Sequence, residues 1–149
     1  MAAFDGSILI DRSPSAVFDV VCDRLFETQP EWEDGIEAIV PVTDGPMGVG
    51  SRAVMERRDL LVWRHKTDYK CVGFEQDRLL VMHNDSPGTH VVSMLTVTPL
   101  GENGTLLRFQ VHAELSGLTK VLEPLARIAL RARKETLLDM KKYVERAVP

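Results

Sequence analysis

Nine consecutive residues, from Trp63 to Cys71, combine strict alternation with side chains that can do chemistry. Charged side chains occupy the even positions, and the odd positions carry Trp63, His65, Thr67, Tyr69 and Cys71. This alternation predicts a strand with one buried face. Because a buried polar group costs free energy unless it is hydrogen-bonded, an ordinary core would carry Val, Ile or Leu at those positions. Aromatic and hydrogen-bonding side chains together favour the wall of a cavity that holds a small, largely apolar molecule.

His65 and Tyr69 are the candidates for catalysis in this strand. Residues two apart on one strand face lie about 7 Å apart, so two of them can touch one ligand. An imidazole exchanges protons near neutral pH, and a phenol can donate a hydrogen bond to a carbonyl or phenol. The sequence shows no set of nucleophile, base and orienting group. Three interpretations therefore stay open: the groups satisfy one another or a buried water, they contact a ligand, or they catalyse.

Other predicted elements complete the expected cavity wall. Ser93 lies in a predicted strand over 90–100, Phe109 is on the inward face of the strand that ends at Leu115, and Met140 is in the terminal helix. The predicted ligand-binding residues are Trp63, His65, Thr67, Tyr69, Ser93, Phe109 and Met140.

A second group of possible ligand atoms flanks a predicted hairpin turn. His83 and His90 stand on either side of it and, with Asp85, could face one another across the hairpin. Their spacing matches no recognised metal-ligand pattern, so a solvated hairpin is the default interpretation. We therefore predict no metal and no other cofactor.

The size and charge of the chain limit its class. Its 149 residues, 44% of them hydrophobic, predict a single domain over residues 1–149. The net charge of −4 argues against a nucleic-acid binder. Eight Lys and Arg against four acids follow from Gly117 onward, so that segment carries +4 and the rest −8. The segment is either a solvated helix face or a surface for an acidic partner or an anionic membrane.

The cysteines and the apolar segments of the chain indicate its cellular compartment. Cys22 and Cys71 fall on predicted buried faces, as small core residues in a reducing compartment do. The first residues lack the pattern of a secretion signal, and no apolar run approaches the ~18 residues of a membrane span. We expect a soluble, cytoplasmic protein without a membrane span, either a monomer or a homodimer.

Periodicity predicts the order of the elements. Ser13 and Pro14 form a helix start, and apolar residues then follow at helical spacing as far as Leu25. A short second helix or turn is expected over 27–35. Strands are predicted over 7–12, 36–42, 51–58, 63–71, 79–84, 90–100 and 107–115.

The last thirty or so residues carry apolar side chains at helical period, beginning at Leu118. Pro124 should kink this helix or mark its true start, because proline cannot make the helical hydrogen bond. At ~1.5 Å per residue the helix would cross a whole sheet. Its apolar stripe must be buried, and the inner face of the antiparallel sheet is the available surface.

Short motifs follow one another in the order of a known family. They are Arg12-Ser13-Pro14-Ser15-Ala16-Val17-Phe18, Pro30-Glu31-Trp32, Gly48-Val49-Gly50-Ser51-Arg52, Phe74-Glu75-Gln76-Asp77-Arg78-Leu79, Thr98-Pro99-Leu100 with Gly104-Thr105, Leu122-Glu123-Pro124-Leu125 and Leu137-x-x-Met140-Lys141. With this order of elements, the chain resembles the polyketide cyclase/dehydrase-like branch of the START/Bet v 1-like (SRPBCC) superfamily.

This resemblance implies an α+β helix-grip fold. A curved seven-stranded antiparallel sheet would wrap around the long C-terminal helix, with two short helices after the first strand and an apolar cavity between sheet and helix. Members of the superfamily bind lipids, polyketides, quinones or hormones, and some of them are enzymes. No motif of this chain carries over the catalytic residues of the aromatase/cyclases.

Residues and resemblance together favour a protein that binds a hydrophobic small molecule such as a lipid, polyketide or quinone. The first alternative is a polyketide cyclase, aromatase or dehydratase with His65 and Tyr69 as its acid–base pair. The second is an interaction module that uses the basic C-terminal helix on a protein or membrane.

Overall fold

The computed structural model describes residues 2–59 and 63–149, apart from the side chains of Asp59, Trp63 and Arg64. Seven antiparallel strands form one sheet in the order β1-β7-β6-β5-β4-β3-β2. The strands are β1 (Ala2–Ile10), β2 (Ile36–Pro41), β3 (Arg52–Asp59), β4 (Trp63–Glu75), β5 (Leu79–Ser86), β6 (Thr89–Leu100) and β7 (Gly104–Leu115). The predicted seven-stranded antiparallel sheet is confirmed, and several strands extend further than alternation indicated.

Two short helices follow β1, as predicted. Ser13 caps α1 (Pro14–Phe18), because its Oγ accepts a hydrogen bond from the Ala16 amide at 3.3 Å. The single helix expected as far as Leu25 is instead interrupted by a π-helical turn, η1 (Asp19–Asp23). Helix α2 (Leu25–Trp32) follows the turn and contains Pro30.

The terminal segment divides into three pieces. A 3-10 turn, η2 (Gly117–Leu122), leads into α3 (Glu123–Arg131) and α4 (Arg133–Ala147). Pro124 lies in the first turn of α3, so it marks the true start of the helix, which was one of its two predicted roles. A second break, at Ala132, has no proline or glycine and was not predicted.

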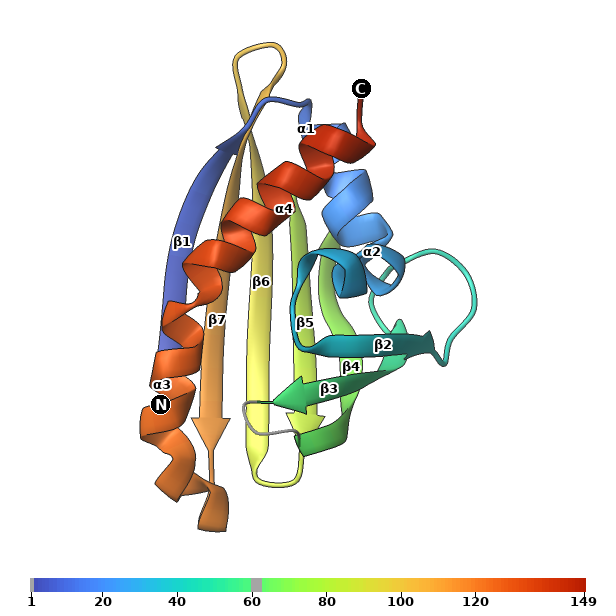
Figure 1. Ribbon diagram of the computed structural model, residues 1–149. Coiled ribbons are helices and arrows are strands. Elements are labelled where there is room, and N and C mark those ends of the chain that lie inside the picture. Colours follow the sequence, from blue (N-terminus) through green and yellow to red (C-terminus); the bar gives the residue numbers. More distant parts are fainter. Residues whose placement is uncertain (1, 60–62) are drawn as a thin grey trace.

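Helix α4 lies across the concave face of the sheet, as Figure 1 shows, and contacts β1 most extensively. It buries Leu137, Met140 and Val144 against the sheet. Strand β7 alternates as predicted, with its odd-numbered residues from Thr105 to Ala113 buried. Register shifts in β2 and at Cys71/Gly73 in β4 are bulges, which bend a sheet and increase its twist. The predicted helix-grip architecture is confirmed.

The apolar stripe of the terminal segment is not buried along its whole length, contrary to our expectation. Leu118, Val121 and Ile128 are 92%, 78% and 59% exposed. A 3-10 turn places residues every 120° rather than every 100°, so η2 shifts the stripe out of phase. The inner side of α3 meets a cavity through residues such as Ala126 and Leu130, and Ile128 lies on its exposed side.

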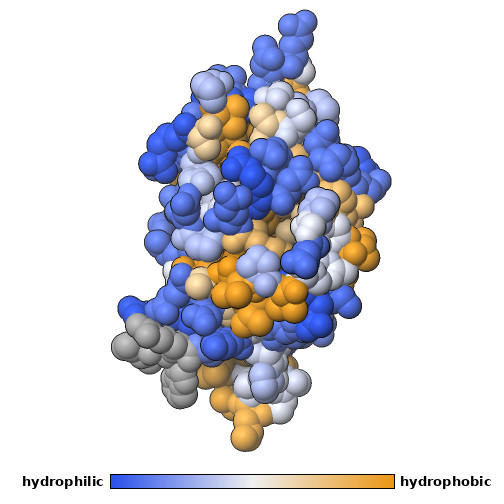
Figure 2. Space-filling view, turned by 90° about the vertical axis from the view of Figure 1, so that its right-hand side faces the viewer, coloured by the Kyte–Doolittle hydropathy of each residue, from blue (hydrophilic) through white to orange (hydrophobic). Residues whose placement is uncertain are grey.

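Exposed apolar residues also occur on the opposite flank. Figure 2 shows the face on the β2 side, where apolar side chains lie among polar ones. The exposed large hydrophobic residues of β2 and the following loop are Val40, Val42 and Val49. Within the described residues, no helix has the length and apolar character that a bilayer crossing requires.

Candidate functional site

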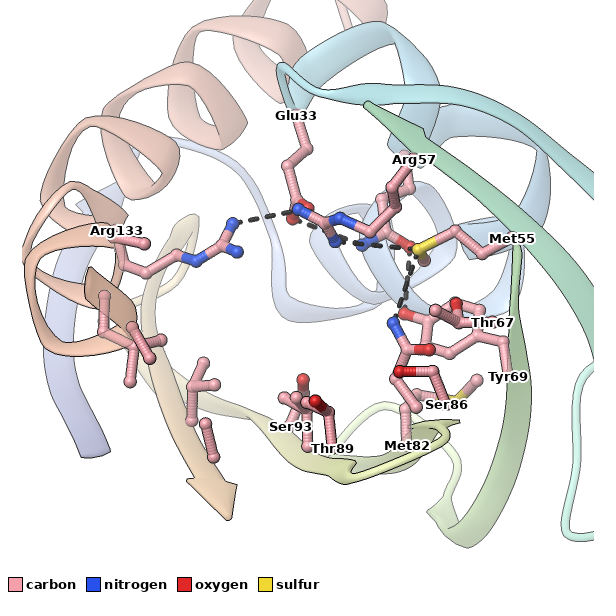
Figure 3. A pocket seen from close by; sticks show the side chains of 18 of the residues that line it. Glu33, Met55, Arg57, Thr67, Tyr69, Met82, Ser86, Thr89, Ser93 and Arg133 are labelled. Carbon is pink, nitrogen blue, oxygen red and sulfur yellow. Dashed lines mark hydrogen bonds and ion pairs between the residues drawn. The ribbon is translucent and has the colours of Figure 1, made fainter. Parts of the chain in front are cut away.

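A cavity of about 440 Å³ lies between the concave face of the sheet and the helices α2, α3 and the start of α4. Its volume falls within the range of ~300–1,000 Å³ that is usual for small-molecule sites. Aliphatic and aromatic side chains make up most of its wall, and polar side chains project into it at separate places (Figure 3). The cavity can therefore enclose an apolar molecule and fix its orientation through a few polar contacts.

Five of the seven predicted ligand-binding residues line this cavity. They are His65, Thr67, Tyr69, Ser93 and Phe109. The side chain of Trp63 lies outside the described residues. Met140 is fully buried between α4 and the sheet and does not line the cavity, because the cavity lies beside the first turn of α4 and Met140 is two turns further along.

Cross-strand register brings the lining residues together. Met55 on β3 stands opposite Thr67, Tyr69 opposite Asn84, and Met82 opposite Ser93. Directly opposed residues on one face lie about 4.5–5.5 Å apart, so these pairs form continuous rows across the concave surface. A single ligand can thus touch residues from four strands.

Three charged side chains converge at the α2 side of the cavity. The Glu33 carboxylate Oε2 lies 3.1 Å from Arg57 Nη1 and 3.3 Å from Arg133 Nη1. The Glu33 side chain is 4% exposed, and those of Arg57 and Arg133 are 16% and 19% exposed. Burial by itself raises the pKa of Glu33, but Arg133, Arg57 and the Gln29 amide outweigh it and hold the pKa below its usual value. Glu33 is therefore a buried carboxylate anion between two guanidinium groups.

Tyr69 belongs to the same network. Its hydroxyl donates a 2.9 Å hydrogen bond to Gln29 Oε1, and Gln29 Nε2 donates to Glu33 Oε1 at 3.3 Å. Burial and the nearby Glu33 raise the pKa of Tyr69 far above its usual value. The phenol is consequently held as a neutral hydrogen-bond donor, which does not favour the acid–base role predicted for it.

Three buried polar atoms of the described residues have no hydrogen-bond partner. They are Thr67 Oγ1, Asn84 Oδ1 and Arg133 Nε. All three residues line this cavity. Unpartnered buried polar atoms are rare in folded proteins, and each calls for an explanation such as a strained site, a catalytic role, or a bound water or ion. Their common location means that a molecule in the cavity could hydrogen-bond to these atoms.

Thr67→Val tests whether this hydroxyl is unpartnered. We expect the free energy of unfolding of the ligand-free protein to rise by about 1 kcal/mol, because a buried hydroxyl without a partner costs roughly that or more. Urea unfolding measures the change. Thr105→Val is the matched control, since the buried Thr105 donates a 2.7 Å hydrogen bond to the Arg12 carbonyl. The free energy of unfolding of Thr105→Val should fall by about 1 kcal/mol. An equal fall for Thr67→Val would contradict the prediction.

The charged cluster was missed in the sequence, although part of it leaves a signal. Arg57 is in phase with the inward-facing Ala53 and Met55, and Asn84 is in phase with Leu80 and Met82. A polar residue on the apolar face of a strand is such a signal. Glu33 and Arg133 lie at helix ends among other charged residues, where nothing distinguishes them from solvated side chains.

His83, Asp85 and His90 meet on the outer face of the sheet, away from the cavity. Their potential ligand atoms all lie within 4.8 Å of one another. His90 Nδ1 contacts the Asp85 carboxylate, and the two imidazole rings meet edge to face with centroids 4.8 Å apart. The hairpin predicted between β5 and β6 is confirmed, and it brings these three side chains together across the strands.

Comparison with known proteins agrees with this geometry. A START superfamily protein from Mycobacterium smegmatis has a TM-score of 0.79 and 14% identity, covering 99% of this chain and 100% of that chain. Truncated norcoclaurine synthase from Thalictrum flavum has a TM-score of 0.70 and 16% identity, covering 95% and 92%. The di-domain ARO/CYC BexL of the BE-7585A biosynthetic pathway has a TM-score of 0.69 and 17% identity, covering 96% and 50%.

Likenesses at these identities show the fold. Among curated protein sequences, none matches this chain. The model of one sequence family does match, and it covers residues 1–145. The chain therefore belongs to the polyketide cyclase / dehydrase and lipid transport family, and its fold is the one seen in a START superfamily protein.

Proposed function

We propose that this protein binds a hydrophobic small molecule, such as a lipid, polyketide or quinone, in the cavity between the sheet and the terminal helices. The observation that carries the proposal is a cavity with a mostly apolar wall in which three buried polar atoms lack partners. The apolar wall supplies affinity by burying ligand surface, and the few polar atoms supply orientation. The family is consistent with such a ligand.

Ser93→Phe tests the proposal by filling the cavity. Ser93 lies in the middle of β6 and lines the cavity floor, so a phenyl ring at this position occupies ligand space. We expect the affinity for a fluorescent probe with an apolar aromatic body and one sulfonate group to fall at least about tenfold, or ~1.4 kcal/mol. Titration of the purified protein with 1-anilinonaphthalene-8-sulfonate, with competition by unlabelled lipids and quinones, measures the loss.

Val92→Phe is the matched control. Val92 is the neighbour of Ser93 in β6, and its side chain points to the opposite face of the sheet, away from the cavity. The control should bind the probe as wild type does. Equal affinity in all three proteins would place the probe elsewhere and overturn the proposal. Native mass spectrometry of the wild type, followed by organic extraction, would identify a molecule that co-purifies.

A cyclase or dehydratase acting on a poly-keto substrate is the second candidate. The observation in its favour is that His65 lines the cavity and lies opposite Arg57 in the β3–β4 register, beside the charged cluster. An imidazole in such a position can exchange a proton with a bound carbonyl compound. Conversion of a poly-β-keto substrate by the purified protein, followed by mass spectrometry, separates this candidate from simple binding.

The third candidate is a protein- or membrane-interaction module. The observation in its favour is the exposure of Leu118, Val121 and Ile128, next to the exposed Lys120 and Arg127. An apolar surface with neighbouring cations fits an anionic bilayer. Sedimentation with anionic and with neutral vesicles distinguishes this role from binding in the cavity.

A further inference from the structure

We infer that His83, Asp85 and His90 form a binding site for a divalent transition-metal ion, with zinc as its type, on the outer face of the sheet. The inference goes beyond the proposed function, because this site lies on the opposite face of the sheet from the cavity. The sequence predicted no metal, since the spacing of these residues along the chain does not reveal how they meet across the β5–β6 hairpin.

Cross-strand register brings three ligand-bearing side chains to one point. His83 and Asp85 are two positions apart in β5 and so share a face, and Asp85 stands directly opposite His90 of β6. Each residue offers one ligand atom, and these atoms all lie within 4.8 Å of one another. The ligand atoms of a tetrahedral zinc ion, each about 2.0–2.2 Å from it, are about 3.3–3.6 Å apart. Side-chain rotation supplies this adjustment, as the contact between His90 Nδ1 and the Asp85 carboxylate opens to admit the ion.

The donor set selects the class of metal. Neutral imidazole nitrogen is a favoured ligand of zinc, copper, nickel and iron ions, and two of the three donors here are imidazoles. Calcium and magnesium instead take about six or more oxygen ligands, which this cluster does not supply. Two histidines with one carboxylate, and water in the remaining position, are a coordination set that zinc accepts in proteins.

A hollow beside the cluster gives an ion access from solvent. Its volume is about 320 Å³, and Asp85, His90 and Glu114 line it together with the hairpin turn. The side chains of Asp85 and His90 are 47% and 40% exposed. Glu114 of β7 stands directly opposite His90 and adds a second carboxylate to the hollow, whereas Lys70 of β4 stands opposite His83 at the other end of the cluster. The negative charge on the Asp85 side favours a cation there.

The hairpin turn that carries the cluster is anchored from outside. Gly88 has a positive φ of 77°, and its carbonyl accepts hydrogen bonds from the Ser116 amide, at 2.9 Å, and from the Thr119 hydroxyl. A side chain at position 88 would come within 2.7 Å of Thr119, so glycine permits this close approach. The turn therefore holds the adjoining ends of β5 and β6 in place, and a preorganised site loses less entropy when an ion binds.

Calorimetric titration of the untagged, chelator-treated protein with zinc chloride and with magnesium chloride tests the site. We expect about one zinc ion per chain, bound at least about a hundredfold more tightly than magnesium. His83→Gln, Asp85→Asn and His90→Gln should each lower the zinc affinity at least about tenfold, because each removes one of three ligands. Zinc should also raise the thermal unfolding midpoint of wild type more than that of these variants.

His112→Gln is the matched control. His112 is an imidazole on the same outer face, opposite Val92 in the β6–β7 register, and it is not one of the three residues whose ligand atoms meet. This variant should bind zinc as wild type does. The two cysteines are buried, so they do not compete for the ion.

Imidazole proton resonances of wild type give a measurement that needs no folded variant. The signals of His83 and His90 should shift on addition of zinc, while that of His112 should stay in place. Equal zinc affinity in wild type and the three ligand variants would overturn the inference, as would the absence of zinc binding at about 1 mM or equal affinity for zinc and magnesium. Each of these results would leave the proposed function standing, because Ser93→Phe tests the cavity separately.

Discussion

Glu33→Gln is expected to lower the free energy of unfolding by about 3–5 kcal/mol, the range seen when one partner of a buried ion pair is removed. The substitution keeps the size of the side chain and replaces the carboxylate with a neutral amide, so Arg57 and Arg133 lose the anion that they share. Urea denaturation followed by circular dichroism measures the loss. Asp34→Asn, at the exposed neighbouring position, is the control and should change stability by less than about 0.5 kcal/mol.

The same variant should also change the response to acid. The pKa of Glu33 in the folded protein lies below its ordinary value of 4.5, so protons bind this carboxylate more weakly in the folded than in the unfolded chain. Its stabilising contribution is therefore complete above about pH 4.5 and is lost as the pH falls through the folded-state pKa. Glu33→Gln should show a smaller loss of stability over this acidic window than wild type does. Two results would contradict the role assigned to Glu33. One is the same dependence of stability on acidic pH in Glu33→Gln and wild type, and the other is a urea unfolding midpoint of Glu33→Gln equal to that of Asp34→Asn.

The fold was largely predictable because its strands obey local rules. Alternation between Trp63 and Cys71 and between Thr105 and Ala113 assigns each residue to a face, since a strand's side chains point to opposite sides in turn. Ser13 and Pro14 likewise mark a helix start by local chemistry. These signals depend on neighbours in the chain and so can be read from it.

The terminal segment shows where such rules stop. Its helical period continues through Leu118 and Val121, but these residues lie in a 3-10 turn and are exposed. The break between α3 and α4 at Ala132 has no proline or glycine that would mark it in the sequence. Met140 was predicted to line the cavity because it lies on the apolar stripe of the terminal helix. The helical period alone does not indicate which turns of that stripe face the cavity and which pack against the sheet.

The charged part of the site depended on contacts distant in sequence. Glu33 directly follows α2, Arg57 lies in β3 and Arg133 begins α4, so Glu33 and Arg133 are 100 positions apart in the sequence. Each of these residues has charged neighbours in the sequence, and burial arises only when the three elements pack together. The alternation of β4 placed His65, Thr67 and Tyr69 on one face, and all three line the cavity. The ion pairs of Glu33 with Arg57 and Arg133 could be found only from the three-dimensional structure.

The chain end is attached to the sheet by polar contacts as well as by the buried stripe of α4. Arg12 donates from Nε to the Val148 carbonyl at 2.7 Å and from Nη2 to the Glu145 carbonyl at 2.8 Å. Lys141 Nζ donates to the Leu9 carbonyl at 2.7 Å. The last carbonyl groups of a helix have no N–H partner within that helix, and Arg12 donates hydrogen bonds to carbonyls at this end of α4. The positive charge of Arg12 also complements the negative end of the helix dipole.

Arg12→Ala is accordingly expected to lower the free energy of unfolding by about 2–3 kcal/mol, because hydrogen bonds from charged groups contribute more than neutral ones. Amide exchange in the last turns of α4 should accelerate more than exchange in β6, since the helix end loses its attachment while the centre of the sheet keeps its own hydrogen bonds. Arg146→Ala is the control: its guanidinium is exposed and bonds within α4, to the Lys142 carbonyl at 3.4 Å. A loss in Arg12→Ala no larger than in Arg146→Ala would show that the apolar stripe of α4 is sufficient to hold the helix in place.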